Sequence, residues 1–130
     1  MRSLSRGWTV LLAPALLVLS GCGAKLKFDE TINVPATGWS KREFVQPLVD
    51  QAEVKVSSPG APVDVYFVLE SNLKEATEAI DKGMVPKNLI TKGEKVQNQS
   101  FTLSPGKKSF TIFLVGTGKN ADVRVIATSK

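Results

Sequence analysis

Apolar and polar positions alternate with a period of two over much of the chain beyond residue 25, as in strands that bury one face. The first such segment, residues 26–34, carries four apolar side chains on one parity: Leu26, Phe28, Ile32 and Val34. Glu30 falls on the same parity. The pattern therefore predicts a strand that contains a bulge or a slip in register.

The next alternating segments predict the centre of the fold. Val54 and Val56 alternate with charged residues in AEVKVSS, and the turn-forming SPGAP then leads into PVDVYFVLES. We expect these two strands to form a hairpin. Residues 63–69 carry apolar side chains on both faces, which predicts a central strand.

One segment, NLKEATEAIDKG, has the period of a helix. Asn72 can cap it, Glu75 stands at the capping-box position, and Gly83 can end it. We expect one short helix over residues 73–82.

The rest of the chain is again strand-like. QSFTL, SFTIFLVGT and ADVRVIATS are separated by the turns SPGKK and GKN, which predicts a meander. Six or seven short strands with one short helix, and no alternation of strands with helices, predict a mainly β protein. We expect a single antiparallel β-sandwich over residues 26–130.

The amino-terminal segment has a different composition. Two arginines lie in residues 1–6, an apolar run with Pro14 in its middle follows over residues 8–19, and small residues come next. This order is that of a secretory signal peptide, and the run is shorter than the roughly 20 residues of a membrane-spanning helix. We expect residues 1–21 to be a signal peptide that is removed.

Leu19-Ser20-Gly21-Cys22 resembles the lipobox of bacterial lipoproteins. The resemblance implies cleavage between Gly21 and Cys22, attachment of a diacylglyceryl group with acyl chains such as palmitate to Cys22, and a tether over residues 22–25. Gly23, which is not aspartate, implies the outer membrane or cell surface rather than the inner membrane. The alternative is that Cys22 is a buried small side chain or simply follows an ordinary cleavage site.

Composition excludes much familiar chemistry. The chain has no histidine and a single cysteine, so imidazole catalysis, an intrachain disulfide and a thiolate zinc site are ruled out. The formal net charge is +5, without the arginine cluster that nucleic acid demands. Lys25 and Lys27 either add attraction to an anionic leaflet or solubilise the chain, and the turn lysines Lys107, Lys108 and Lys119 are better explained by solvation than by ligand binding.

Carboxylates are the remaining acid–base groups. The pairs Asp29 with Glu30 and Glu75 with Glu78 form no catalytic signature. A calcium site is conceivable if loop-end acids cluster, but no calcium-loop motif is present; the candidate acids are Asp50, Asp64, Asp81 and Asp122. We expect no enzyme activity, no metal site and no cofactor. Trp39 and Tyr66 are candidate ligand contacts, because exposed aromatic rings stack on sugars, although packing is the commoner role of such residues.

Residues 61–90 together with FTLSPGKKSFTIFLVGTGKNADVRVIATS resemble small exported bacterial β-sandwich domains of the GOLD-like and pre-peptidase type. The shared features are the VDVYFVL strand, the helical insert before NLI, and the final pair SFTIFLV and ADVRVIA. The resemblance implies a non-catalytic binding or scaffolding role. We expect a membrane-anchored protein whose partner is an envelope protein or polysaccharide. A carbohydrate- or envelope-polymer-binding module is the alternative, and a hydrolase is a remote one.

Overall fold

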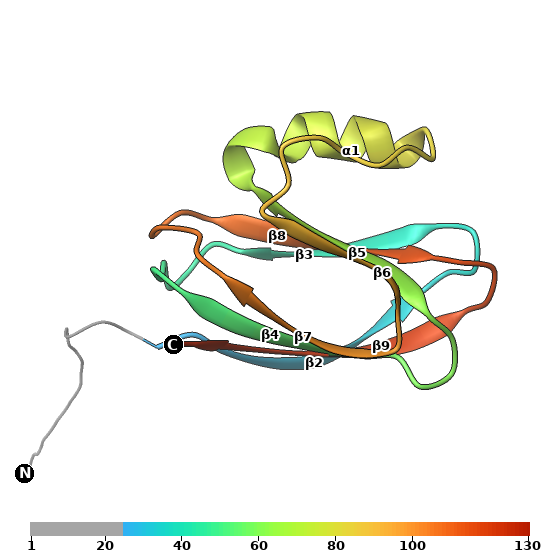
Figure 1. Ribbon diagram of the computed structural model, residues 1–130, viewed down its shortest axis with the longest axis horizontal. Helices are drawn as coiled ribbons and strands as arrows, with labels where there is room; N and C mark the ends of the chain where they lie inside the picture. The colour runs from blue at the N-terminus through green and yellow to red at the C-terminus, as the bar shows by residue number, and fades with distance from the viewer. Residues whose placement is uncertain (1–24) are drawn as a thin grey trace, which may run out of the picture.

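Two four-stranded antiparallel sheets pack face to face in the computed structural model, which describes residues 25–130, and one helix lies outside the second sheet (Figure 1). The predicted signal peptide, with Gly21 and Cys22, lies outside the described residues. The first sheet contains β2 (Lys27–Val34), β9 (Ala121–Ser129), β4 (Ala52–Ser57) and β7 (Asn98–Leu103), in that order. The second contains β3 (Trp39–Phe44), β8 (Phe110–Gly116), β5 (Val63–Leu69) and β6 (Thr91–Val96). The prediction of a mainly β sandwich is confirmed, with eight strands rather than six or seven.

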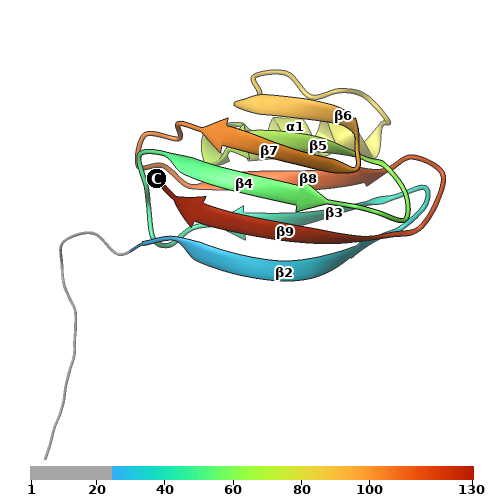
Figure 2. The same cartoon turned by 60° about the horizontal axis from the view of Figure 1, so that its bottom comes forward.

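The connections alternate between the sheets (Figure 2). Every link between consecutive strands crosses from one sheet to the other except the link from β5 to β6, which contains the helix. This strand order is that of a jelly roll. The predicted hairpin of β4 with β5 and the predicted meander of β7, β8 and β9 are therefore wrong. The turn signals mark real turns, but those turns arch between layers instead of joining neighbouring strands.

The predicted irregularity at Glu30 is also wrong. The register of β2 against β9 runs without a break from Lys27 opposite Thr128 to Val34 opposite Ala121. Glu30 keeps its place in the strand because β2 is an edge strand. Its carboxylate accepts a hydrogen bond from Nε of Arg42 on β3, the adjacent edge of the other sheet, at 3.1 Å. The ion pair spans the open edge of the sandwich.

The inner faces of the two sheets form the main core. β5 and β8 each contribute alternate side chains that are almost wholly buried, and the largest of these include Phe67, Ile112 and Leu114. β9 contributes Val123 and Val125, as its pattern predicts.

A second, smaller core lies on the outer face of the second sheet. Helix α1 (Leu73–Asp81), preceded by the 3₁₀ turn η2 (Glu70–Asn72), covers this face (Figure 1). Ala76 and Ile80 of the helix pack against three outward side chains of β5 and β8: Tyr66, Val68 and Phe113. This explains why β5 is apolar on both faces. The predicted central strand and the predicted helix are confirmed.

Candidate functional site

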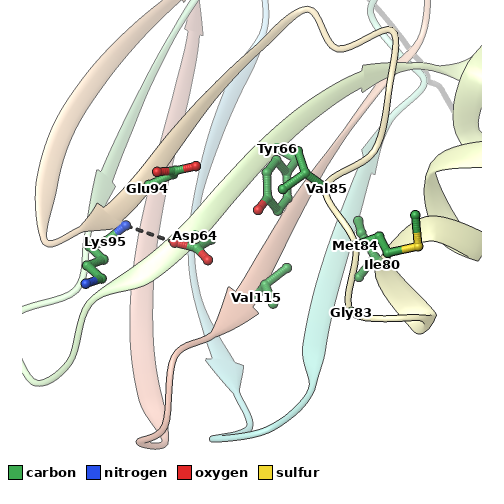
Figure 3. A pocket seen from close by; sticks show the side chains of 9 residues that line it. All are labelled: Asp64, Tyr66, Ile80, Gly83, Met84, Val85, Glu94, Lys95 and Val115. Atoms are coloured by element: carbon green, nitrogen blue, oxygen red, sulfur yellow. Dashed lines mark hydrogen bonds between the residues drawn. The ribbon is translucent and has the colours of Figure 1, made fainter.

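Two adjoining cavities open on the outer face of the second sheet, where α1 ends. Their volumes are about 350 and 560 Å³, and they share four lining residues: Asp64, Ile80, Gly83 and Val115. We call the two cavities together the groove. Figure 3 shows the first cavity, with Asp64, Glu94 and Lys95 at one side and Ile80 and Met84 at the other.

One wall of the groove is formed where the helix ends. Gly83 adopts a φ of 72°, a conformation that glycine reaches without strain. Its N–H donates to the carbonyl of Ile80 at 3.0 Å, and the N–H of Met84 donates to the carbonyl of Ala79 at 2.9 Å. This pair of bonds is a Schellman motif, which stops the helix and turns the chain back over the sheet.

The turn leaves two apolar side chains in water. Met84 is 59% exposed and Val85 is 49% exposed, and both line the first cavity. Exposed apolar side chains beside a cavity are typical of binding surfaces.

A β-bulge forms the opposite wall. Val63 pairs with Val96 but Val65 pairs with Gly93, so two residues of β6, Glu94 and Lys95, oppose the single residue Asp64. Lys95 has a φ of 52°, which is uncommon for a residue with a side chain.

Asp64 stabilises the bulge directly. The N–H of Lys95 donates to Oδ1 of Asp64 at 2.9 Å, as the dashed line in Figure 3 marks. The bulge brings both Glu94 and Lys95 to the cavity, whereas regular alternation would place them on opposite faces of β6.

Tyr66, one of the two predicted ligand contacts, lies in the floor of the first cavity. The residue is only 5% exposed and packs in the second core, so most of its ring is structural. Burial raises the pKa of the phenol above 10.0, and the negative charges of Asp64 and Glu94 raise the pKa further. The hydroxyl therefore stays protonated at neutral pH and is available as a hydrogen-bond donor.

Trp39, the other predicted contact, lines the second cavity from β3. Its ring packs edge-on against Phe113, with 5.5 Å between the ring centres. Its indole N–H donates to Oδ1 of Asp81, the last residue of α1, at 2.9 Å. Trp39 thus joins the edge strand to the end of the helix, and the structure brings both predicted residues to one groove without presenting either ring as an open stacking face.

The carboxylate pairs considered from the sequence are separated by the fold. Asp29 accepts two hydrogen bonds from Arg124, one from Nε at 3.0 Å and one from Nη2 at 2.7 Å. Glu30 instead accepts a hydrogen bond from Arg42. The hydrogen bond from Arg124 holds the pKa of Asp29 below its usual value of 3.8.

Glu75 does not close a capping box. The helix has no side-chain cap bond at Asn72, and Oε1 of Glu75 instead accepts a hydrogen bond from Asn88 at 3.3 Å. With Glu78 it borders a third surface hollow beside α1, which shares Met84 and Val85 with the first cavity.

Three acids and one lysine line the groove: Asp64, Asp81, Glu94 and Lys95. The sequence named Asp64 and Asp81 only as acids that could cluster at loop ends, and it did not single out Glu94 or Lys95, because the bulge and the return of the chain at Gly83 bring these four residues together. In residues 25–130, no group of three or more His, Cys, Asp or Glu side chains is placed to hold a metal ion. No helix within the same range has the length and apolar character needed to cross a bilayer.

No protein-family model matches the chain, and no curated protein matches it.

Proposed function

We propose that this protein is a lipid-anchored component of the bacterial cell envelope whose sandwich binds an envelope protein through the groove. The proposed anchor rests on the signal-peptide pattern that ends at Cys22. The proposed binding role is carried by one observation: Met84 and Val85 stand exposed at the mouth of a cavity in a domain whose other large apolar side chains are mostly packed.

The chemistry of the groove favours a particular kind of partner. Its apolar wall of Ile80, Met84 and Val115 fits an apolar side chain, and the excess of acids over lysine fits a neighbouring cation. A protein segment that combines apolar and basic side chains meets both requirements. This role requires no catalysis, in line with the lack of histidine in the chain.

A carbohydrate partner is the second candidate, and a different observation favours it. The Tyr66 hydroxyl, a donor, lies in the same cavity as the acceptor carboxylates of Asp64 and Glu94, with Trp39 in the adjoining cavity. Sugar hydroxyls need such mixed donors and acceptors. Jelly rolls also include lectin domains, which is an analogy at the level of the fold alone.

The anchor is tested on the mature amino terminus. Mass spectrometry of the first peptide is expected to show Cys22 as residue one with a diacylglyceryl adduct, and a Cys22→Ser chain is expected to lose the adduct. An unmodified Cys22, or a mature terminus at another residue, contradicts the anchor.

The groove is tested by cross-linking in intact cells. A photoreactive amino acid in place of Met84 is expected to give discrete adducts with a partner protein. The same group in place of Lys55, exposed on β4 of the other sheet, serves as the matched control. Adding Glu94→Lys to the position-84 chain is expected to abolish the adducts, because it reverses one of the three acids. Identical adducts at positions 84 and 55 contradict binding in the groove.

Sedimentation with purified peptidoglycan and a glycan array separate the two candidates. Retention that falls with Tyr66→Phe and Trp39→Phe supports the carbohydrate partner. Retention that is unchanged by both substitutions contradicts it.

A further inference from the structure

The described chain begins at one end of the sandwich, which we call the tether end and define as residues 25–26, 45–51, 104–109 and 130. Backbone hydrogen bonds hold these segments together. The N–H of Ser129 donates to the carbonyl of Leu26 at 3.2 Å, and the N–H of Lys107 donates to that of Val49 at 2.8 Å. Figures 1 and 2 show the start of β2 beside the end of β9 at this end.

Two apolar side chains of the tether end lie in water. Val45 is 49% exposed and Leu48 is 42% exposed, although Val49 next to them is buried in the main core. Val49 fixes the loop on the sandwich. Within residues 25–130 the other two exposed large apolar side chains, Met84 and Val85, line the first cavity of the groove on the outer face of the second sheet.

Positive charge accompanies this apolar pair. The tether end carries four lysines: Lys25, Lys107, Lys108 and Lys130. Asp50 is the acid within it, and Glu70 lies beside it, where its N–H donates to the carbonyl of Ser109 at 3.0 Å. The turn over residues 117–120 at the opposite end carries one lysine, Lys119. The three turn lysines of the sequence are thus divided by the fold between the two ends.

The length of the tether restricts where this end can lie. Two residues lie between Cys22 and Lys25, and each of the three residue steps covers at most about 3.6 Å in a fully extended chain, or roughly 11 Å in all. A lipid on Cys22 would therefore hold the tether end within contact distance of the headgroups.

We propose that the tether end docks on an anionic phospholipid surface, with Val45 and Leu48 at the boundary of headgroups and acyl chains and the lysines on the phosphates. This inference rests on the proposed lipid attachment at Cys22. Docking sets the direction of the groove. The second cavity is lined by Thr37, Gly38 and Gly116 at the opposite end of the strands, so docking would place it at the end of the sandwich that is far from the membrane.

The test uses the mature lipidated protein in vesicles of phosphatidylcholine with or without phosphatidylglycerol. Lipidation consumes the single thiol, so one introduced cysteine is a unique labelling site. Ser104→Cys places a fluorophore at the tether end. Gly60→Cys places it at the opposite end, where an added Cβ meets no atom within 4 Å. Quenching by lipids with a nitroxide in the acyl chain then reports how closely each end approaches the membrane.

In vesicles with phosphatidylglycerol we expect strong quenching at position 104 and little at position 60. In phosphatidylcholine alone we expect weaker quenching at position 104, because the tether then holds this end near the bilayer without docking it. Each lysine removed is expected to weaken docking about fivefold, so Lys107→Gln with Lys108→Gln weakens it roughly 25-fold. Lys119→Gln is the matched control and is expected to change nothing. Leu48→Gln is expected to weaken docking. Met84→Gln, which changes an exposed apolar side chain outside the tether end, is the matched control and is expected to have no effect.

The outcomes separate this inference from the anchor on which it rests. Equal quenching at both positions, or quenching that is indifferent to the lysine and Leu48 variants while the protein floats with the vesicles, overturns the docking surface and leaves the anchor intact. A protein that carries no lipid mass on Cys22 and does not float with vesicles contradicts the anchor itself and, with it, this inference.

Discussion

Replacing Gly116 by alanine tests whether the groove depends on a close backbone approach. Gly116 ends β8 and lies against the turn that leads into Trp39. A Cβ at this position would lie 2.0 Å from the carbonyl oxygen of Pro35 and 2.7 Å from that of Ala36. Ordinary non-bonded contacts of carbon atoms are roughly 3.5–4.0 Å, so the turn must move by more than 1 Å.

The expected cost follows from the atoms involved. The neighbours are backbone atoms, which cannot rotate aside, and overpacking of this kind costs about 1–3 kcal/mol. The displacement also stretches the hydrogen bond from the N–H of Gly116 to the carbonyl of Gly38, now 2.9 Å, whose loss costs about 0.5–1.5 kcal/mol. Alanine restricts the unfolded chain, which returns about 0.4–1 kcal/mol. The net loss in the free energy of unfolding is about 2 kcal/mol at the centre of these ranges, or roughly 8–16 °C in Tm for a domain of this size.

Urea unfolding followed by circular dichroism measures this loss, with Gly60→Ala as the matched control. Gly60 has open space around its Cβ position, so its substitution is expected to be neutral or slightly stabilising. Surface substitutions usually change the free energy of unfolding by about 0.5 kcal/mol or less. If the free energies of unfolding of Gly116→Ala and the control differ by less than about 0.5 kcal/mol, the close approach does not constrain the fold and the reasoning is refuted.

Three further predictions concern the core and the ionisable groups. Phe67→Ala removes a fully buried ring from the main core and is expected to cost about 3–5 kcal/mol in urea unfolding, and a loss below 1 kcal/mol contradicts the packing. Tyr66 is the only tyrosine in the sequence, so absorbance near 295 nm follows the ionisation of this phenol alone. We expect the phenol to ionise above pH 10, and we expect Asp64→Asn to lower its pKa. Because the folded pKa is raised, the stability due to neutral Tyr66 is complete below the unfolded pKa and is lost as pH rises toward the folded one. Arg124 lowers the pKa of Asp29 in the folded protein. The ion pair therefore stabilises the fold above the unfolded pKa of Asp29, and this stabilisation is lost as the pH falls through the folded pKa. Arg124→Gln is expected to flatten this part of the acid unfolding profile, and an unchanged profile contradicts a stabilising role for the ion pair.

The strands that the sequence predicts are those with a buried face, and the missed ones are polar edges. β5, β8 and β9 alternate visibly because each packs on the core. β3 and β6, WSKREF and TKGEKV, are the edge strands of the second sheet and have little apolar alternation. Edge strands carry charged residues that discourage pairing with other chains, and this removes the periodic signal.

Topology and the groove depend on contacts that no local pattern records. A turn such as SPGAP reads the same whether it joins neighbouring strands or arches between layers, so the predicted hairpin and meander failed. Trp39 and Tyr66 could be chosen as aromatic residues with polar ends, but Asp81, which accepts the hydrogen bond of the Trp39 indole, lies 42 residues away along the chain. The bulge at Lys95 is visible only in the register of β5 against β6.

The pairing of β2 with β9 joins the first strand of the sandwich to the last. β9 also lies between β2 and β4, so β2 has no neighbour in the first sheet until Ala121–Ser129 is present. For a chain that leaves the cytoplasm amino terminus first, the sandwich cannot close until its final strand has crossed the membrane. If Cys22 is lipidated as proposed, it would reach the modifying enzymes before β9 has crossed, so attachment would precede folding and the domain would complete its fold while already held at the bilayer.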